Sequence, residues 1–301
     1  MLNMSYLKTC SKEMKLNKVV YALALLLSCN FLFPVFVYAD DSALLLGVFP
    51  RRNANVTIRM FKPLAEYLSV KTGRKVTIDT AKNFPVFWEN VMKGEYDIVH
   101  YNQLHYIESN QKLGYQVIAQ NEEFGVKKIR GALIVRKDSG INSVKDLKGK
   151  TVLFGGGKKA FVSYIVNAVA LSNAGLKKSD YITKFAKNPP NATIATFLKQ
   201  SDAAGIGDAG LKIPILKKKG IDVSEFKIVS LSSSLPHLPW AVNKSMSKQD
   251  KLLIQKVLLS LNDSHDGRKI IKHAGLTGIN IAEDKHYEHS REIIKEFNFI
   301  K

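Results

Sequence analysis

Cysteine is almost absent from the sequence, and the two that occur lie near its start. Cys10 and Cys29 both fall within the first 39 of the 301 residues. If the chain is cleaved after Ala39, as its N-terminal segment indicates, the mature protein contains no cysteine. Disulfides, thiolate nucleophiles and cysteine-ligated metal sites are then excluded.

The sequence also lacks internal repeats, low-complexity tracts and arginine-rich or basic–aromatic runs. Its formal net charge is nevertheless +19, and about +16 without the first 39 residues, which hold four lysines and one glutamate. The lysines are dispersed and form only short clusters at 158–159, 177–178 and 217–219. This distribution predicts a solvated basic surface that suits an anionic ligand, and it does not indicate a nucleic-acid groove.

Two nucleotide-binding motifs are incomplete in the glycine-rich stretch 151–164. A P-loop would need a glycine where Val152 stands and a hydroxyl residue where Lys159 stands. The spacing of three small residues from Gly155 to Ala160 fits a dinucleotide loop, but the next strand-like run ends in basic residues where a ribose-binding acid is required. The stretch therefore predicts either an anion-binding turn or a mobile turn with solvated lysines.

Two further motifs are also weak. The pair His286 and His289 has the i, i+3 spacing of metal ligands, but the lysines and glutamates around it favour a solvated helix face. Segments 245–248 and 71–73 resemble β-lactamase motifs, but they occur in reversed order and no Ser-Asp-Asn motif accompanies them. We therefore predict no metal site, no catalytic residue and no cofactor.

The N-terminal segment has the layout of a secretory signal peptide. Lys15 and Lys18 precede an apolar run over 19–39, in which Val37 and Ala39 are the small residues that a cleavage site requires. Met14 stands directly before this unit and is a candidate for the true start. We predict cleavage after Ala39 and export to the periplasm.

Two alternatives apply to the same segment. The apolar run is long enough to span a bilayer, so an uncleaved anchor is the first alternative. Cys29 follows a short lipoprotein-like box, which makes lipidation the second, although the run stays apolar beyond this residue.

Strand-like and helix-like runs alternate after the N-terminal segment, which predicts βα units around mostly parallel sheets. Up to residue 139 we expect strands at 43–49, 75–79, 96–101 and 129–139, and helices at 57–71, 84–94 and 103–112. Beyond it we expect strands at 151–154, 181–186, 203–207, 226–232 and 237–243, and helices at 144–148, 159–174, 191–199, 208–219 and over most of 247–301.

This order predicts two lobes joined by two crossovers. A long strand leaves the first set of βα units, and a return strand near 226–231 precedes the C-terminal helices. We assign residues 1–39 to the signal peptide, 40–136 and 233–301 to lobe 1, and 137–232 to lobe 2. Since ligands of open α/β sheets bind beyond the carboxyl ends of the strands, we expect the ligand in the cleft.

Several segments together resemble one known family. They are "GVFPRRN", "FKPLAEYLSVKTGRKV", "KGEYDIVHYNQLHYIES", "IRGALIVRKDSGINSVKDLKGKTVLF" and "LPHLPWAVN", and the likeness covers residues 43–300. The chain is similar to the phosphate/phosphite/phosphonate-binding family of periplasmic solute-binding proteins of ABC importers. The resemblance implies a two-lobed α/β protein of the type II periplasmic binding fold, in which each lobe has a mixed, mostly parallel sheet flanked by helices and two strands form the hinge. It also implies a small oxyanion ligand and an inner-membrane ABC permease as partner, and we expect a monomer.

Two departures from the family pattern weaken the assignment of a ligand. The family commonly has a Ser/Thr-Ser-Gly segment after the second-lobe strand, where this chain has residues 155–159, three glycines and two lysines. The family often has Asn-Pro-Tyr after the third strand, where this chain has Asn102, Gln103 and Leu104.

The candidate ligand-binding residues lie where strands end and helices begin. Amides and the positive end of a helix dipole at residues 155–159 suit an anion, and two lysines add charge. From this placement and the resemblance, the candidates are Asn53, Asn55, Tyr101, Asn102, His105, Gly156, Gly157, Lys158, Lys159, Asp208 and His237.

The candidates have different expected roles, and each has a structural alternative. Tyr101 and Asn102 suit oxyanion contacts, and His105 would be a donor that gains charge at low pH, or a capping group. Asp208 would accept from a protonated phosphite or phosphate O–H, or would only cap a helix. His237 would lie near the cleft or only in the hinge. The arginines at 51–52 are expected to be solvated.

Three functions fit this sequence, and the first fits best. It is capture of a small oxyanion, such as phosphate, phosphite or a phosphonate, by hinge closure for an importer. The second is a sensor that docks on a membrane receptor or kinase, which an uncleaved anchor would favour. The third is an exported enzyme, for which the sequence offers no nucleophile or general base near 155–159.

Overall fold

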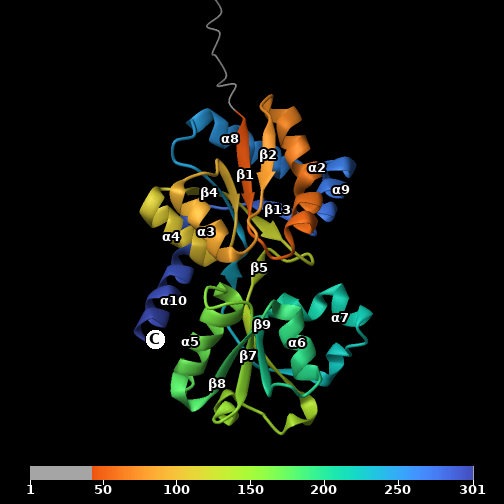
Figure 1. Ribbon diagram of the computed structural model, residues 1–301, viewed down its shortest axis with the longest axis vertical. Helices are drawn as coiled ribbons and strands as arrows, with labels where there is room; N and C mark the ends of the chain where they lie inside the picture. Colours follow the sequence, from red (N-terminus) through yellow and green to blue (C-terminus); the bar gives the residue numbers. More distant parts are fainter. Residues whose placement is uncertain (1–42, 301) are drawn as a thin grey trace, which may run out of the picture. The chain divides into compact units, whose positions relative to one another are not determined.

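A computed structural model describes residues 43–300 of the chain (Figure 1). Our predictions of a signal peptide, its cleavage after Ala39 and its alternatives lie outside these residues. Within the described part, no helix is both long enough and apolar enough to cross a membrane.

The first of two larger sheets has six strands in the order β13-β4-β12-β3-β1-β2. Strands β1, β2 and β3 are parallel to one another, whereas β12 pairs antiparallel with both β3 and β4, and β13 pairs antiparallel with β4. The strands are β1 (Leu44–Val48), β2 (Val76–Asp79), β3 (Ile98–His100), β4 (Gln116–Glu122), β12 (Pro239–Val242) and β13 (Gly278–Ile281).

The second sheet has five strands in the order β10-β6-β9-β7-β8. Strand β7 is parallel to β8 and β9, and β6 is antiparallel to β9 and β10. The strands are β6 (Gly131–Arg136), β7 (Thr151–Gly155), β8 (Ile182–Ala186), β9 (Ala203–Gly207) and β10 (Phe226–Leu231). The carboxyl ends of β7 and β9 carry the glycine-rich loop and Asp208.

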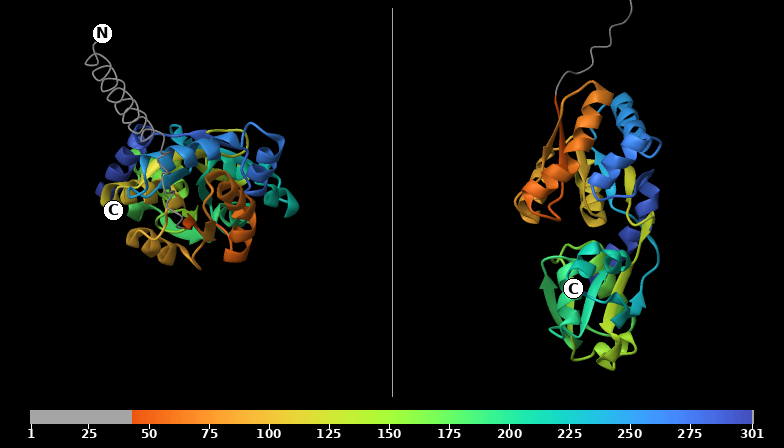
Figure 2. Two further views of the ribbon diagram at one scale, coloured as in Figure 1. Left: turned by 90° about the horizontal axis from the view of Figure 1, so that it is seen from above. Right: turned by 90° about the vertical axis from the view of Figure 1, so that its right-hand side faces the viewer.

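Two crossing segments connect the sheets and pair with each other. Strand β5 (Lys128–Ile129) lies antiparallel to β11 (Leu235–Pro236) in a two-stranded ribbon (Figure 2). The first crossover therefore lies before β6. Our boundary at residue 136 placed β6 in lobe 1. That boundary is wrong because β6 pairs only within the second sheet.

Three helices of the first lobe begin and end with the same pair of residue types. The helices α2 (Ala54–Thr72), α3 (Phe84–Lys93) and α4 (Gln103–Leu113) each follow an asparagine whose side chain accepts a backbone N–H of the first turn. Each ends at a glycine with φ between 70° and 75°, a conformation that costs glycine little. Asparagine and glycine therefore fix where these helices start and stop.

The remaining helices are mostly short. The first lobe adds α8 (Lys248–Ser260) and α9 (His265–His273), and the second has α5 (Val166–Asn173), α6 (Pro189–Phe197) and α7 (Pro214–Lys218). A π-helical turn, Phe161–Ile165, leads into α5. Turns of 3-10 helix lie at Lys137–Ser139, Val144–Leu147, Lys178–Asp180, Asp208–Lys212, Val223–Glu225 and Asp284–Tyr287.

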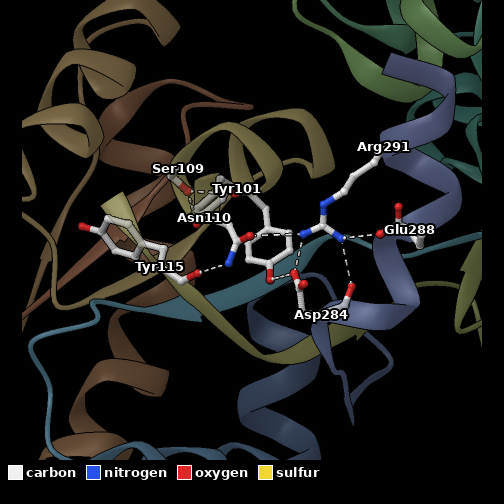
Figure 3. A network of polar contacts seen from close by, with 8 residues as sticks. Tyr101, Ser109, Asn110, Tyr115, Asp284, Glu288 and Arg291 are labelled. Carbon is white, nitrogen blue, oxygen red and sulfur yellow. Dashed lines mark hydrogen bonds and ion pairs between the residues drawn. The ribbon is translucent and has the colours of Figure 1, made fainter. Parts of the chain in front are cut away.

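The last helix, α10 (Glu288–Phe299), packs on both lobes. Its Ile293 and Phe297 are buried in the core of the second lobe, where the Phe297 ring lies 5.4 Å from that of Tyr164. Arg291 reaches the first lobe, where it donates to Asn110 over 3.2 Å and pairs with Asp284 (Figure 3). Helix α10 is thus a third connection between the lobes, and it does not belong to lobe 1 alone as our boundary implied.

Candidate ligand-binding site

The loop after β7 has the shape that its glycines demand. A Cβ on Gly155 would come within 2.4 Å of the Pro189 Cα, which no side chain tolerates. Gly156 has φ 121°, and a Cβ there would lie 2.9 Å from that of Ala160. Gly157 is exposed with open space around its Cα. Close backbone packing therefore requires Gly155, the positive φ and the Ala160 side chain require Gly156, and Gly157 leaves the loop surface bare.

The same loop presents free backbone donors. Gly156 N donates to Ala186 O over 2.9 Å, and Ala160 N donates to Gly157 O over 2.9 Å. The amides of the three residues between them, 157–159, donate to no acceptor within the described chain. These amides precede the π-helical turn, so three consecutive N–H groups lie just before a helix start, as they do in anion-binding loops.

The two loop lysines have different environments. Lys159 Nζ lies 3.4 Å from Glu108 Oε2 and 4.9 Å from the ring centroid of Trp88, both in the first lobe. Its carbonyl also accepts from Asn102 Nδ2 over 3.1 Å. Lys158 is exposed and, among the residues described, has no ion-pair partner. Lys158 is therefore the uncompensated cation of the loop, and Lys159 joins the loop to the first lobe.

Asn102 and Tyr101 are already occupied by protein contacts. Asn102 Oδ1 accepts from His105 N over 2.9 Å and caps α4, while its Nδ2 reaches Lys159. The Tyr101 hydroxyl is buried and bonded to Ser109 Oγ over 2.8 Å (Figure 3), and burial raises its pKa well above the usual value. The Tyr101 hydroxyl is therefore not available to a ligand, whereas the Asn102 side chain already donates to the loop.

His105 is buried as a neutral ring. It stacks on Trp88 with ring centroids 4.7 Å apart, and its Nδ1 has no hydrogen-bond partner among the described residues. Burial first, and then the charge of Lys159, lower the pKa of His105 to about 3. We expected this histidine to gain charge at low pH, and the lowered pKa moves that change to about pH 3, because the ring is desolvated and lies next to a lysine.

Asp208 is neutralised by an arginine of the first crossover. Its Oδ2 accepts from Arg130 Nε over 2.9 Å, and its Oδ1 accepts from the backbone N–H groups of Arg130 and Ala209. We expected this carboxylate to contact the ligand or cap a helix. In this structure its acceptor sites are used mainly to fix the crossover against β9.

His237 lies in the second crossover and is fully buried. Its Nδ1 accepts from Leu238 N over 2.8 Å, so the neutral ring carries its proton on Nε2, which has no partner among the described residues. Its carbonyl accepts from the Tyr287 hydroxyl over 3.0 Å. Burial lowers the pKa of His237. The ring is held within the hinge, and one donor remains unused.

The two asparagines after β1 differ from each other. Asn53 Oδ1 accepts from Val56 N over 3.0 Å and caps α2, whereas Asn55 is exposed on the first turn of that helix. Asn53 therefore has a structural role in this conformation. No contact of Asn55 links it to the loop at 155–159.

The sequence did not reveal a charged pocket beside β1. Both arginines of this segment are exposed, as we expected, and Arg51 Nη1 in addition pairs with Glu123 Oε1 over 2.8 Å. Burial would raise the pKa of Glu123, but the Arg51 guanidinium lowers it to about 2. Arg51, Arg52 and Glu123 line a pocket of about 250 Å³ together with residues of both lobes. Glu123 follows β4, a strand that we did not predict.

No metal centre is evident in the described chain. Within residues 43–300, no group of three or more His, Cys, Asp or Glu side chains is placed to hold a metal ion. The carboxylates near the crossovers, Glu123 and Asp208, are instead paired with arginines. The chemistry available at the loop is anion binding by amides and one lysine.

Comparisons with known proteins give one consistent result. A family model described as "ABC transporter, phosphonate, periplasmic substrate-binding protein" matches residues 46–287. The chain is 22% identical over 290 residues to the phosphonates-binding periplasmic protein of Escherichia coli (strain K12). This alignment covers 94% of this chain and 84% of that protein.

Solved structures agree with this result at the level of the fold. PhnD1 from Prochlorococcus marinus (MIT 9301), in complex with methylphosphonate, has a TM-score of 0.73 at 18% identity, covering 86% of this chain and 99% of that one. A binding protein component of an ABC phosphonate transporter from Pseudomonas aeruginosa has a TM-score of 0.72 at 16% identity, covering 86% and 87%. They confirm the fold class that we predicted.

Proposed function

The chain belongs to the phosphonate family of periplasmic substrate-binding proteins of ABC transporters, and on this basis we propose that it captures a small phosphorus oxyanion for import. Phosphonates are the first candidates, with phosphite and phosphate next. Capture and delivery form no covalent bond with the ligand, so the protein acts as a binding protein.

The free amides at 157–159 are the observation that supports this ligand class most directly. Three consecutive N–H groups in front of a helix can each donate to one oxygen of a tetrahedral anion. The exposed Lys158 adds a full positive charge beside them. The hydroxyl residues common in the family are absent here, so backbone donors and this lysine replace them.

Hinge motion would complete the site. The paired crossovers β5 and β11 are short, so the lobes can rotate about them while each sheet stays intact. The contact from Asn102 to Lys159 shows that the loop already meets the first lobe on one side. A ligand held by the loop would be covered when the remaining edge of the cleft closes.

Export and the transporter partner belong to the same proposal. We infer that the N-terminal segment directs the chain to the periplasm and is cleaved after Ala39. The closed, loaded form then docks as a monomer on an inner-membrane ABC permease. Nucleic acid and cofactors have no part in this cycle.

Isothermal titration of the exported protein tests the ligand. Methylphosphonate, phosphite, phosphate and sulfate should be compared, and we expect a phosphorus anion to bind most tightly. Lys158→Ala should weaken that binding at least tenfold, about 1.4 kcal/mol. Lys256→Ala, which removes an exposed lysine of α8, is the control and should leave the affinity unchanged.

Two results would contradict the proposal. Binding of sulfate alone would refute the phosphorus ligand. Equal affinities of the Lys158→Ala variant and the unmodified protein would show that the glycine loop is only a turn.

A further inference from the structure

The pocket beside β1 is separate from the glycine loop. Its volume of about 250 Å³ lies below the roughly 300–1,000 Å³ of sites for drug-sized ligands, so it would take a smaller molecule. Its walls come from the end of β1, the start of α2, the turn after β4 and the segment 274–276, with Ile213 and Pro214 from the second lobe. It shares no residue with 155–159.

The pocket carries one uncompensated positive charge. Its single carboxylate, Glu123, is already paired with Arg51 over 2.8 Å. His100 is neutral, since burial lowers its pKa to about 3. Among the residues described, no carboxylate pairs with Arg52. The net charge of the pocket at neutral pH is therefore close to +1, and Arg52 supplies this charge.

Arg52 is held against the wall of the pocket. Its Nη2 would lie 3.9 Å from a Cβ placed on Gly275, which puts the guanidinium beside the 274–276 segment. Burial, and then the neighbouring charge of Arg51, lower the pKa of Arg52. Arg52 is exposed as a residue, so its guanidinium remains charged and is open to an anion that enters the pocket from solvent.

The rest of the wall is mostly apolar and includes three phenylalanines. Phe49 and Phe61 are buried in it, and Phe124 stands at its edge with 37% of its surface exposed. Phe124 has φ 54°, a left-handed conformation that costs a bulky residue about 1 kcal/mol or more. It is the first residue of a two-residue turn, Phe124–Gly125, where asparagine would fit the backbone better. The turn thus keeps an aromatic ring at the pocket at a cost in stability.

From this arrangement we propose that the pocket is a second ligand site, for a small aromatic carboxylate. The carboxylate binds the guanidinium of Arg52 through two parallel hydrogen bonds, and the ring packs among the phenylalanines. A monoanion balances the single free charge, whereas a phosphonate dianion would leave an excess negative charge in an apolar pocket. Residues of both lobes line the site, so its occupation also favours the closed form.

Titration of the exported protein with phenylacetate tests this site. The unmodified protein should bind, and Arg52→Gln should weaken binding at least tenfold, because it removes the charge and keeps most of the side-chain volume. Arg59→Gln, an exposed arginine further along α2, is the matched control and should bind like the unmodified protein. Phe124→Asn suits the left-handed backbone, so it should fold at least as stably and still bind phenylacetate more weakly.

The outcomes separate this proposal from that for the glycine loop. We expect Arg52→Gln to leave methylphosphonate binding intact and Lys158→Ala to leave phenylacetate binding intact. The second site is refuted if the unmodified protein does not bind phenylacetate, or if Arg52→Gln binds it equally well. It is also refuted if phenylacetate competes with methylphosphonate and both lose affinity in the same variant.

Discussion

Replacing Lys159 with alanine removes the side-chain contacts that join the glycine loop to the first lobe. The ammonium group lies 3.4 Å from Glu108 Oε2 and 4.9 Å from the ring centroid of Trp88. The bond from Asn102 Nδ2 to the carbonyl of residue 159 does not depend on the side chain and should persist. The substitution therefore weakens the contact between the lobes without abolishing it.

The expected effect is about 1 kcal/mol. The side chains of Lys159 and Glu108 are 51% and 28% exposed, so solvent screens their ion pair to about 0.5 kcal/mol. A partly exposed lysine over a tryptophan ring adds about 0.5 kcal/mol. The sum corresponds to a roughly fivefold shift of the equilibrium between lobes in contact and lobes apart.

The shift can be measured as a distance between spin labels. The sequence from residue 40 onward contains no cysteine, so cysteines introduced at exposed Glu66 and Lys217 would carry the labels, one in each lobe. Without ligand, Lys159→Ala should increase the fraction of long distances about fivefold, and Glu108→Gln should give part of the change. Lys158→Ala is the control, because that side chain has no hydrogen bond or ion pair with the first lobe among residues 43–300. If Lys159→Ala and the unmodified protein had the same distance distribution, the contact would contribute nothing.

Two further predictions concern stability. Gly155→Ala should lower the free energy of unfolding by about 2 kcal/mol in urea titration, because its Cβ meets the Pro189 backbone, while Gly157→Ala should change it by less than about 0.5 kcal/mol. Glu123→Gln should cost about 2 kcal/mol near pH 7, since it leaves Arg51 without its partner. Because the folded-state pKa of Glu123 is lowered from 4.5 to about 2, the stabilisation is present above pH 4.5 and is lost as the pH falls toward 2. A constant difference between variant and unmodified protein over that range would contradict this assignment.

The sequence predicted most helices and strands because their ends are marked locally. Asn53, Asn83 and Asn102 and the glycines that follow each helix are capping signals that can be read without a structure. The expected helix over 208–219 is divided in the structure, because Pro214 starts a new helix after a 3-10 turn. Proline lacks the N–H that a continuous helix would need there.

Strands β4, β11 and β13 were missed because they are short or have no clear alternation of apolar and polar residues. Strand β4 contains Gln120 and Asn121, both buried, which bond the backbone of His237 and the indole of Trp240. Buried polar residues break the hydrophobic pattern by which a strand is recognised. Strand β13 has only four residues and lies between helices. The assignment of β6 to the second sheet could not be predicted either, because it depends on the pairing of β6 with β9 and β10 and not on the residues of β6.

The placement of the candidate residues at strand ends could be predicted, but their pairings could not. The expected carboxyl ends of two strands indicated the loop at 155–159 and Asp208 as candidate ligand-binding positions. Arg130 neutralises Asp208 from 78 residues away, and Glu108 holds Lys159 from 51 residues away. Such long-range partners have no signature in the local sequence, so the roles of the two loop lysines could be separated only in the structure.

The amide signals of residues 157–159, followed by nitrogen–proton NMR during titration with methylphosphonate, test the central claim most directly. Hydrogen bonds to an anion move amide proton signals downfield, so these three amides should show the largest downfield shifts in the protein. Saturable binding that leaves the three signals in place would show that the anion is held elsewhere.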